Sequence, residues 1–240
     1  MKPTLILLPG LMCDRTAWQP LLPGLGVVAD CRVADHGMAD SLAQMARQVL
    51  AQAPERFALA GHSMGGRIAL EVMRMAPERV THLGLFDTGH LPLPAGEAGE
   101  VETAKRMALL DLARTQGVRA MAAEWVKGMV APERLGDADL IESILDMFER
   151  KNADIFECQL RALIKRPDAS DVLRRLHCPT LVLCGEHDFS APPSQHFALA
   201  GEIPARPPVA VLPGCGHMAM QENPESVLKL MHDWLATPLS

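Results

Sequence analysis

The stretch that most constrains the fold of this chain is residues 57–67, which read Phe-Ala-Leu-Ala-Gly-His-Ser-Met-Gly-Gly-Arg. An apolar run enters it and a helix-compatible run, residues 68–73, leaves it. The pattern predicts a strand, a sharp turn and a helix, with Ser63 at the apex of the turn. Glycine at positions 61 and 65 suits such a turn, because strand and helix approach too closely for a Cβ atom. The turn would hold the serine in a strained conformation and expose its hydroxyl beside a helix N-terminus.

The remaining pattern of the chain predicts an α/β fold with a mostly parallel sheet. Apolar runs typical of strands occupy residues 4–8, 57–60, 80–86, 179–184 and 209–212, and residues 27–33 contain a further short strand. Helical patterns separate most of these runs, and this alternation is typical of parallel strands flanked by helices. Ser41 and Asn223 are placed to cap the helices that begin after them.

One long segment lacks strand patterns. After a Pro-rich connector, only helical periodicity is found, with helices expected over residues 101–116, 118–130, 138–151 and 155–165. We therefore expect residues 1–94 and 169–240 to form the α/β core. Residues 95–168 are expected to form an inserted four-helix cap, or lid, over the sheet.

The composition and the lengths of the apolar runs limit the kinds of partner and the cellular location that we expect. Hydrophobic residues make up 48% of the 240 residues and the net charge is −6, which argues against a nucleic-acid partner. The N-terminal apolar run is too short for a signal peptide, and no apolar stretch is long enough to cross a bilayer. We expect a cytoplasmic monomer or homodimer that acts on a small molecule and has no membrane partner.

The cysteines form no recognisable framework. They stand at positions 13, 31, 158, 178, 184 and 215, without a Cys-x-x-Cys pair. Reduced, mostly buried thiols are the simplest expectation, and we expect neither a metal site nor a cofactor.

Three polar residues follow apolar strands and could carry chemistry: Ser63, Asp188 and His217. Parallel strands end at the same sheet edge, so these side chains are expected to converge. Histidine could activate the weak serine nucleophile, and the aspartate could orient and stabilise the histidine. Asp87 also follows a strand and is the competing candidate for the acid.

With these residues in place, nearly the whole chain resembles the α/β-hydrolase-fold serine hydrolases that carry a helical cap. The likeness lies in residues 8–11, 61–66, 178–188 and 214–217. It implies an oxyanion hole made by the backbone N–H groups of Leu11 and Met64. Pro9 is a departure, because it stands where that family usually has a histidine.

The substrate is less constrained by the sequence. Apolar side chains of the predicted cap, Trp125 among them, favour carboxylic esters of small to medium apolar acids or alcohols. Arg67 is the second candidate for substrate binding. The stretch from Gly61 to Arg67 also resembles that of the menaquinone-pathway enzymes that eliminate pyruvate, and capped relatives include ring-fission-product and enol-lactone hydrolases.

Three functions therefore remain open at this point. The first is hydrolysis of a carboxylic ester through an acyl-enzyme on Ser63. The second is a lyase, carbon–carbon or enol-lactone reaction on a carboxylated substrate held by Arg67, provided that Arg67 faces the pocket. The third, from another class, is a non-catalytic receptor for a small ligand.

Overall fold

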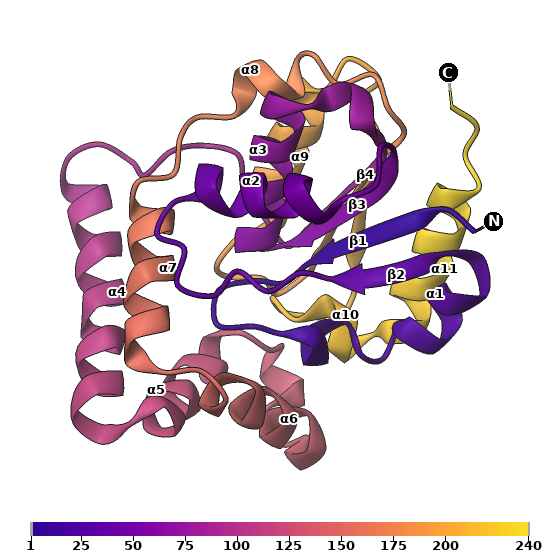
Figure 1. The fold of residues 1–240 in the computed structure, drawn as a ribbon. Helices are drawn as coiled ribbons and strands as arrows, with labels where there is room; N and C mark the ends of the chain where they lie inside the picture. Colours follow the sequence, from indigo (N-terminus) through magenta and orange to yellow (C-terminus); the bar gives the residue numbers. More distant parts are fainter. Residues whose placement is uncertain (1, 240) are drawn as a thin grey trace.

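The computed structural model describes residues 2–239 (Figure 1), and its strands form one six-stranded parallel sheet in the order β2-β1-β3-β4-β5-β6. The strands are β1 (Thr4–Leu8), β2 (Asp30–Val33), β3 (Phe57–His62), β4 (Val80–Phe86), β5 (Thr180–Gly185) and β6 (Val209–Leu212). The predicted α/β fold with a parallel sheet is confirmed. Every residue of β3 is buried, as its unbroken apolar pattern requires for a strand covered on both faces.

Helices cover both faces of this sheet (Figure 1). One face carries α2 (Leu42–Gln52), α3 (Met64–Met75), α8 (Ser170–Leu173) and α9 (Pro193–Glu202). The other carries α1 (Leu22–Val28), α10 (Ala219–Glu222) and α11 (Pro224–Leu235). Short 3₁₀ helices occupy Arg15–Trp18, Pro77–Arg79, Val126–Gly128 and Pro132–Arg134.

Two helix caps and the position of the second strand agree with the sequence analysis. The side chain of Ser41 accepts from the N–H of Gln44 at 3.2 Å, and that of Asn223 accepts from the N–H of Ser226 at 3.2 Å. The short strand expected within residues 27–33 is β2, which begins at Asp30 because the preceding residues form α1. Pro23 favours this helix at its first turn, and Val27 is 69% exposed instead of buried in the sheet.

Four longer helices lie between β4 and β5 in the chain: α4 (Glu97–Gln116), α5 (Val118–Trp125), α6 (Ala138–Glu149) and α7 (Ala153–Ile164). We call residues 95–168 the helical insertion. Figure 1 shows it beyond the carboxyl ends of the strands, on the side of the sheet away from both chain termini. The helical insertion therefore lies next to the sheet edge at which Ser63, Asp188 and His217 are expected to converge.

Two further findings concern the residues that the structure describes. None of their helices is long and apolar enough to span a membrane. The cysteines are free, with Cys13, Cys184 and Cys215 buried.

Candidate active site

Ser63 stands at the sharp turn between β3 and α3, with φ 54° and ψ −116°. A positive φ is strained for a residue with a side chain, so the surroundings must hold it. The Ser63 N–H donates to the carbonyl of Phe86 at 2.9 Å, and the Ser63 carbonyl accepts from the hydroxyl of Thr88 at 2.7 Å. These bonds fix the backbone of the turn to the end of β4, and Ser63 borders the pocket described below.

The two glycines of the turn are required by close backbone approach. A Cβ atom on Gly61 would lie 2.2 Å from the carbonyl oxygen of Gly65. A Cβ on Gly65 would lie 2.1 Å from the carbonyl oxygen of Leu8, at the end of β1. Only glycine permits these contacts, which agrees with the reason given for both positions from the sequence.

Ser63, His217 and Asp188 form a line of hydrogen bonds. The Oγ of Ser63 lies 2.8 Å from Nε2 of His217, and Nδ1 of His217 lies 2.8 Å from Oδ2 of Asp188. The other Asp188 oxygen accepts from the N–H groups of Ser190 and Ala191 at 2.8 and 2.9 Å. With its oxygens occupied by donors, Asp188 is suited to the carboxylate form, and it fixes the His217 tautomer that carries its proton on Nδ1.

The two candidate acids have different surroundings. Burial acts to raise the pKa of Asp188, but the attraction of His217 and the donated hydrogen bonds outweigh it and lower that pKa. Asp87 is fully buried, and its Oδ1 accepts from the Gly185 N–H at 2.9 Å while its Oδ2 has no partner. Burial and the charge of Asp188 raise the pKa of Asp87 well above its usual range. The structure therefore brings Asp188, and not Asp87, to His217.

Leu11 and Met64 border the same pocket. Met64 is the first residue of α3, where a backbone N–H has no partner within the helix. Within residues 2–239, neither the Leu11 N–H nor the Met64 N–H donates a hydrogen bond to another part of the protein. Both donors are thus free beside Ser63, at positions compatible with an oxyanion hole.

A cavity of about 610 Å³ opens beside Ser63 and His217. Trp125 contributes to its wall and packs against Phe156, with ring centroids 5.7 Å apart. Apolar side chains from the helical insertion line this part of the cavity: Leu109, Trp125, Phe156, Leu160 and Leu163. The insertion's methionines lie elsewhere, since Met121, Met129 and Met147 are buried in the core and Met107 is partly exposed on the surface.

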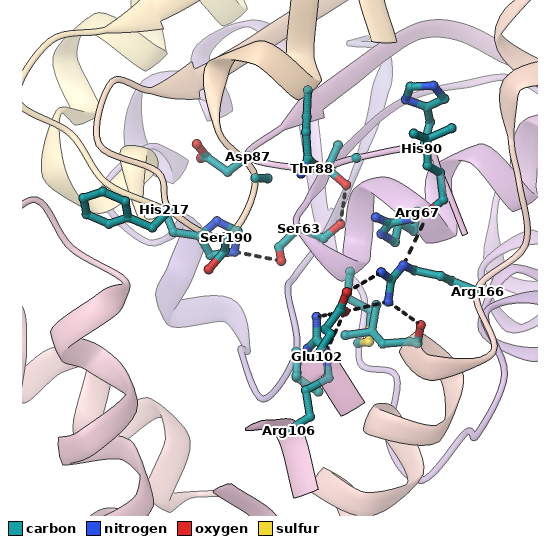
Figure 2. A pocket seen from close by; sticks show the side chains of 18 of the residues that line it. Ser63, Arg67, Asp87, Thr88, His90, Glu102, Arg106, Arg166, Ser190 and His217 are labelled. Carbon is teal, nitrogen blue, oxygen red and sulfur yellow. Dashed lines mark hydrogen bonds and ion pairs between the residues drawn. The ribbon is translucent and has the colours of Figure 1, made fainter. Parts of the chain in front are cut away.

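The opposite part of the cavity is positively charged. Figure 2 shows Arg67, Arg166 and Arg106 grouped with Glu102, on the side of the pocket away from His217. Glu102 accepts from Arg166 at 2.8 and 2.9 Å and from Arg106 at 3.0 Å. One carboxylate thus serves two guanidinium groups, and Lys105 adds another cation to the lining.

Arg67 faces this cavity, which answers the question that the sequence left open. Its Nη1 donates to the carbonyl of Leu91 at 2.8 Å, and it makes no ion pair with any residue in the range 2–239. Burial, and then the charges of Arg166 and Arg106, lower the pKa of Arg67 to about 9, so it stays cationic at neutral pH. A cation in this position, without a carboxylate partner, favours an anionic ligand.

Sequence reasoning missed Glu102, Arg106 and Arg166. The spacing of Glu102 and Arg106, four residues apart on α4, was a signal that could have paired them. Arg166 gave none, because it meets Glu102 from a position 64 residues further along the chain. No group of three or more His, Cys, Asp or Glu side chains suited to a metal ion occurs among the residues described.

Comparison with known proteins places this architecture in a family. Residues 5–230 match the model of the alpha/beta hydrolase family. The chain belongs to this family. As an alpha/beta hydrolase it has a curated relative in Salmonella paratyphi B, 2-succinyl-6-hydroxy-2,4-cyclohexadiene-1-carboxylate synthase. The two are 28% identical over 245 residues, which cover 94% of this chain and 91% of the relative.

Solved structures support the same assignment. An esterase from Thermogutta terrifontis superposes with a TM-score of 0.83 at 25% identity, covering 98% of this alpha/beta hydrolase and 90% of the esterase. The enol-lactonase from Burkholderia xenovorans gives a TM-score of 0.84 at 20% identity, covering 99% and 92% of the two chains. The second similarity concerns the fold alone.

Proposed function

We propose that this protein is a serine hydrolase whose substrate is a carboxylic ester that also carries a free carboxylate group. The observation that carries this proposal is the joint presence of two features in one cavity. The Ser63–His217–Asp188 hydrogen bonds supply an activated nucleophile, and Arg67 supplies a cation without an ion-pair partner.

In the proposed reaction, Nε2 of His217 removes the proton from Ser63 as Oγ attacks the ester carbonyl carbon. The resulting oxyanion accepts hydrogen bonds from the N–H groups of Leu11 and Met64, and loss of one such donor typically costs about a hundredfold or more in rate. His217 then returns the proton to the departing alcohol, which leaves an acyl group on Ser63.

The second half-reaction hydrolyses the acyl-enzyme and releases the acid. His217 takes a proton from water, the hydroxide oxygen attacks the acyl carbonyl, and the proton returns to Ser63 as the carboxylic acid departs. Throughout, Asp188 keeps the imidazole in one tautomer and stabilises its cationic form. No cofactor or metal ion takes part in this scheme.

The anionic part of the substrate is assigned to the arginine side of the cavity. A guanidinium can bind a carboxylate through two parallel hydrogen bonds, and Arg67 has only one protein acceptor. The names of two similar proteins agree with this assignment: the Salmonella relative is named for a carboxylate compound, and the Thermogutta esterase is described with malate, a dicarboxylate, bound. The apolar wall around Trp125 would receive the rest of the substrate.

We further propose that the helical insertion, residues 95–168, acts as a cap that encloses the substrate above the core formed by residues 1–94 and 169–240. The arrangement in Figure 1 supports this, because the insertion lies over the strand ends that bear Ser63, Asp188 and His217. Trp125 from the insertion would then contact the apolar part of the substrate.

A second candidate function uses the same residues for a reaction other than hydrolysis of an open-chain ester. His217 could remove a proton from a carboxylated substrate and trigger elimination, or the site could open an enol-lactone or cleave a carbon–carbon bond. The cationic side of the cavity and the name of the Salmonella relative favour this candidate.

The experiment that separates these functions is a substrate screen with matched pairs. Each pair contains an ester with a free carboxylate and the neutral counterpart in which that carboxylate is methylated. Carboxylated enol-lactones, and succinyl compounds that can undergo elimination, are tested beside these pairs. Our proposal predicts ester turnover, faster for the free carboxylate. Turnover confined to lactones or to compounds that undergo elimination would favour the second candidate. Equal rates within every ester pair would contradict the proposal that the substrate carries a carboxylate.

A further inference from the structure

The loop that bears His217 is held against the helical insertion by its backbone. The His217 N–H donates to the carbonyl of Met129, in the insertion, at 2.7 Å. On the other side, Nε2 of His62 lies 2.8 Å from the His217 carbonyl oxygen. The backbone of the proposed base is therefore fixed by contacts that do not involve its imidazole ring.

A buried carboxylate adds to this arrangement. Oε1 of Glu222 accepts from the N–H of Gly216 at 2.9 Å and from the N–H of Met218 at 3.1 Å. These donors belong to the residues immediately before and after His217. Oε2 of the same carboxylate accepts from the N–H of Ala131, in the helical insertion, at 2.7 Å. One side chain thus joins both neighbours of His217 to the insertion.

The contact between the loop and the insertion leaves no free space. A Cβ atom on Gly216 would lie 2.6 Å from the carbonyl carbon of Val130 and 2.7 Å from the nitrogen of Ala131. The main chain of Glu222 is also tied to the insertion, because Nη1 of Arg134 donates to its carbonyl at 2.6 Å. The position of His217 is therefore set jointly by α10 and by residues 129–134.

Glu222 has no other evident function among the residues described. It is 5% exposed and makes no ion pair, and both its carboxylate oxygens are used on backbone N–H groups. Burial of a charge without an ion pair is costly, so an apolar residue would be expected here if packing were the only requirement. Burial also raises the pKa of Glu222, against the N–H donors and Arg134, which lower it.

We propose that Glu222 is a positioning residue for His217: its carboxylate fixes the backbone on both sides of the histidine and couples that backbone to the helical insertion. The inference rests on the proposed function in so far as His217 acts there as the base. Its physical basis is the steep dependence of rate on geometry, since a displacement of about 1 Å can cost roughly a hundredfold.

The test uses Glu222→Gln, in which an NH₂ group replaces one acceptor and faces a backbone N–H. Glu225→Gln is the matched control, because it makes the same charge change at an exposed position of α11. Active sites are first titrated with a fluorophosphonate, and turnover of a p-nitrophenyl ester is then expressed per titrated site. We expect kcat per site to fall about 10- to 100-fold in Glu222→Gln, with KM within threefold, and no change in the control.

A purely structural role would give a different result. It would lower the fraction of protein that titrates while kcat per titrated site stayed at the wild-type value, and that outcome would overturn the proposal. If Glu222→Gln does not fold, Glu222→Asp takes its place, since its shorter carboxylate keeps the charge but cannot reach all three donors. The same two outcomes then decide.

A second readout does not depend on turnover. The Nδ1 proton shared by His217 and Asp188 should give a downfield proton resonance in NMR spectra. We expect this resonance to shift or broaden in Glu222→Gln and to stay unchanged in Glu225→Gln; an unchanged resonance in Glu222→Gln would contradict the positioning role. Failure of wild-type Ser63 to react with the fluorophosphonate would instead count against the proposed function, and the NMR comparison would still decide the role of Glu222.

Discussion

The Nε2 atom of His217 lies 2.8 Å from the Oγ atom of Ser63, although 154 positions separate the two residues in the chain. The strand ends of the parallel sheet bring them together, and Asp188 meets the far side of the same imidazole at 2.8 Å. This is the geometry that a serine nucleophile needs for activation by a base.

The identity of the acid is tested by a pair of equivalent substitutions. Asp188→Asn removes the charge that stabilises the His217 cation and disturbs its tautomer, so we expect kcat to fall by roughly 10⁴-fold. Asp87→Asn keeps an oxygen that can accept from the Gly185 N–H, and we expect less than about a tenfold loss. Steady-state kinetics on one ester checks both variants. A larger loss in Asp87→Asn than in Asp188→Asn would reassign the acid.

The anionic part of the substrate is tested by Arg67→Met. A hydrogen bond to a charged group contributes about 1.5 to 3 kcal/mol, so we expect kcat/KM for a carboxylated ester to fall about 10- to 100-fold. The neutral methyl-capped ester should change by less than about threefold. Arg161→Met is the control, since Arg161 is exposed and paired with Glu157 outside the cavity. Equal losses for both esters would indicate a general structural effect and not carboxylate binding.

The sequence sufficed for the parts of the site that depend on local pattern. Ser63, Asp188 and His217 each follow an apolar strand, and parallel strands necessarily end at one edge. The close approach at Gly61 and Gly65 could also be inferred, because a strand that turns at once into a helix leaves no room for side chains. Fold class and the convergence of these residues could therefore be inferred from periodicity and turn chemistry, whereas the choice between Asp188 and Asp87 needed the contact with His217.

The remaining features depend on contacts between distant segments. The direction of Arg67 is set by the carbonyl of Leu91, and the charge balance of the cavity by the meeting of Glu102 with Arg166. Glu222 meets Ala131 across 91 positions of the chain. The sequence indicated a short strand within residues 27–33 without locating its first residue, because Val27 and Val28 suit a strand by composition but belong to α1.

The space around two helix glycines differs, and we therefore predict opposite effects of their substitution by alanine on the free energy of unfolding. Gly65→Ala would place a Cβ atom 2.1 Å from the Leu8 carbonyl oxygen, and we expect the free energy of unfolding to fall by at least about 2 kcal/mol. Gly201→Ala, on α9, meets no atom within 4 Å and should raise it by about 0.5 to 1 kcal/mol. Urea denaturation measures both. A Gly65→Ala variant as stable as the wild type would show that the turn can relax.

We predict that buried His36 makes the stability of the fold decrease in acid. Its Nε2 lies 3.2 Å from the Pro9 carbonyl oxygen. Burial lowers the pKa of His36 to about 4, so the unfolded chain binds this proton from near pH 6.5 and the folded chain does not. Its contribution to stability is complete above pH 6.5 and is lost as the pH falls toward 4, by about 3 kcal/mol in all.

The measurement is the free energy of unfolding between pH 7 and pH 4.5. We expect His36→Gln to show a shallower loss of stability on acidification than the wild type, and His187→Gln, at a partly exposed position, to follow the wild type. Parallel curves for His36→Gln and the wild type would contradict the assignment of this proton.

The most direct test of the central claim is covalent labelling of the intact protein with a fluorophosphonate, followed by peptide mass spectrometry. We expect one adduct, located on Ser63, that is absent in Ser63→Ala and forms far more slowly in His217→Ala. The account would be contradicted by a folded wild-type protein that gains no adduct on Ser63, as a non-catalytic receptor would, or that is labelled at another residue.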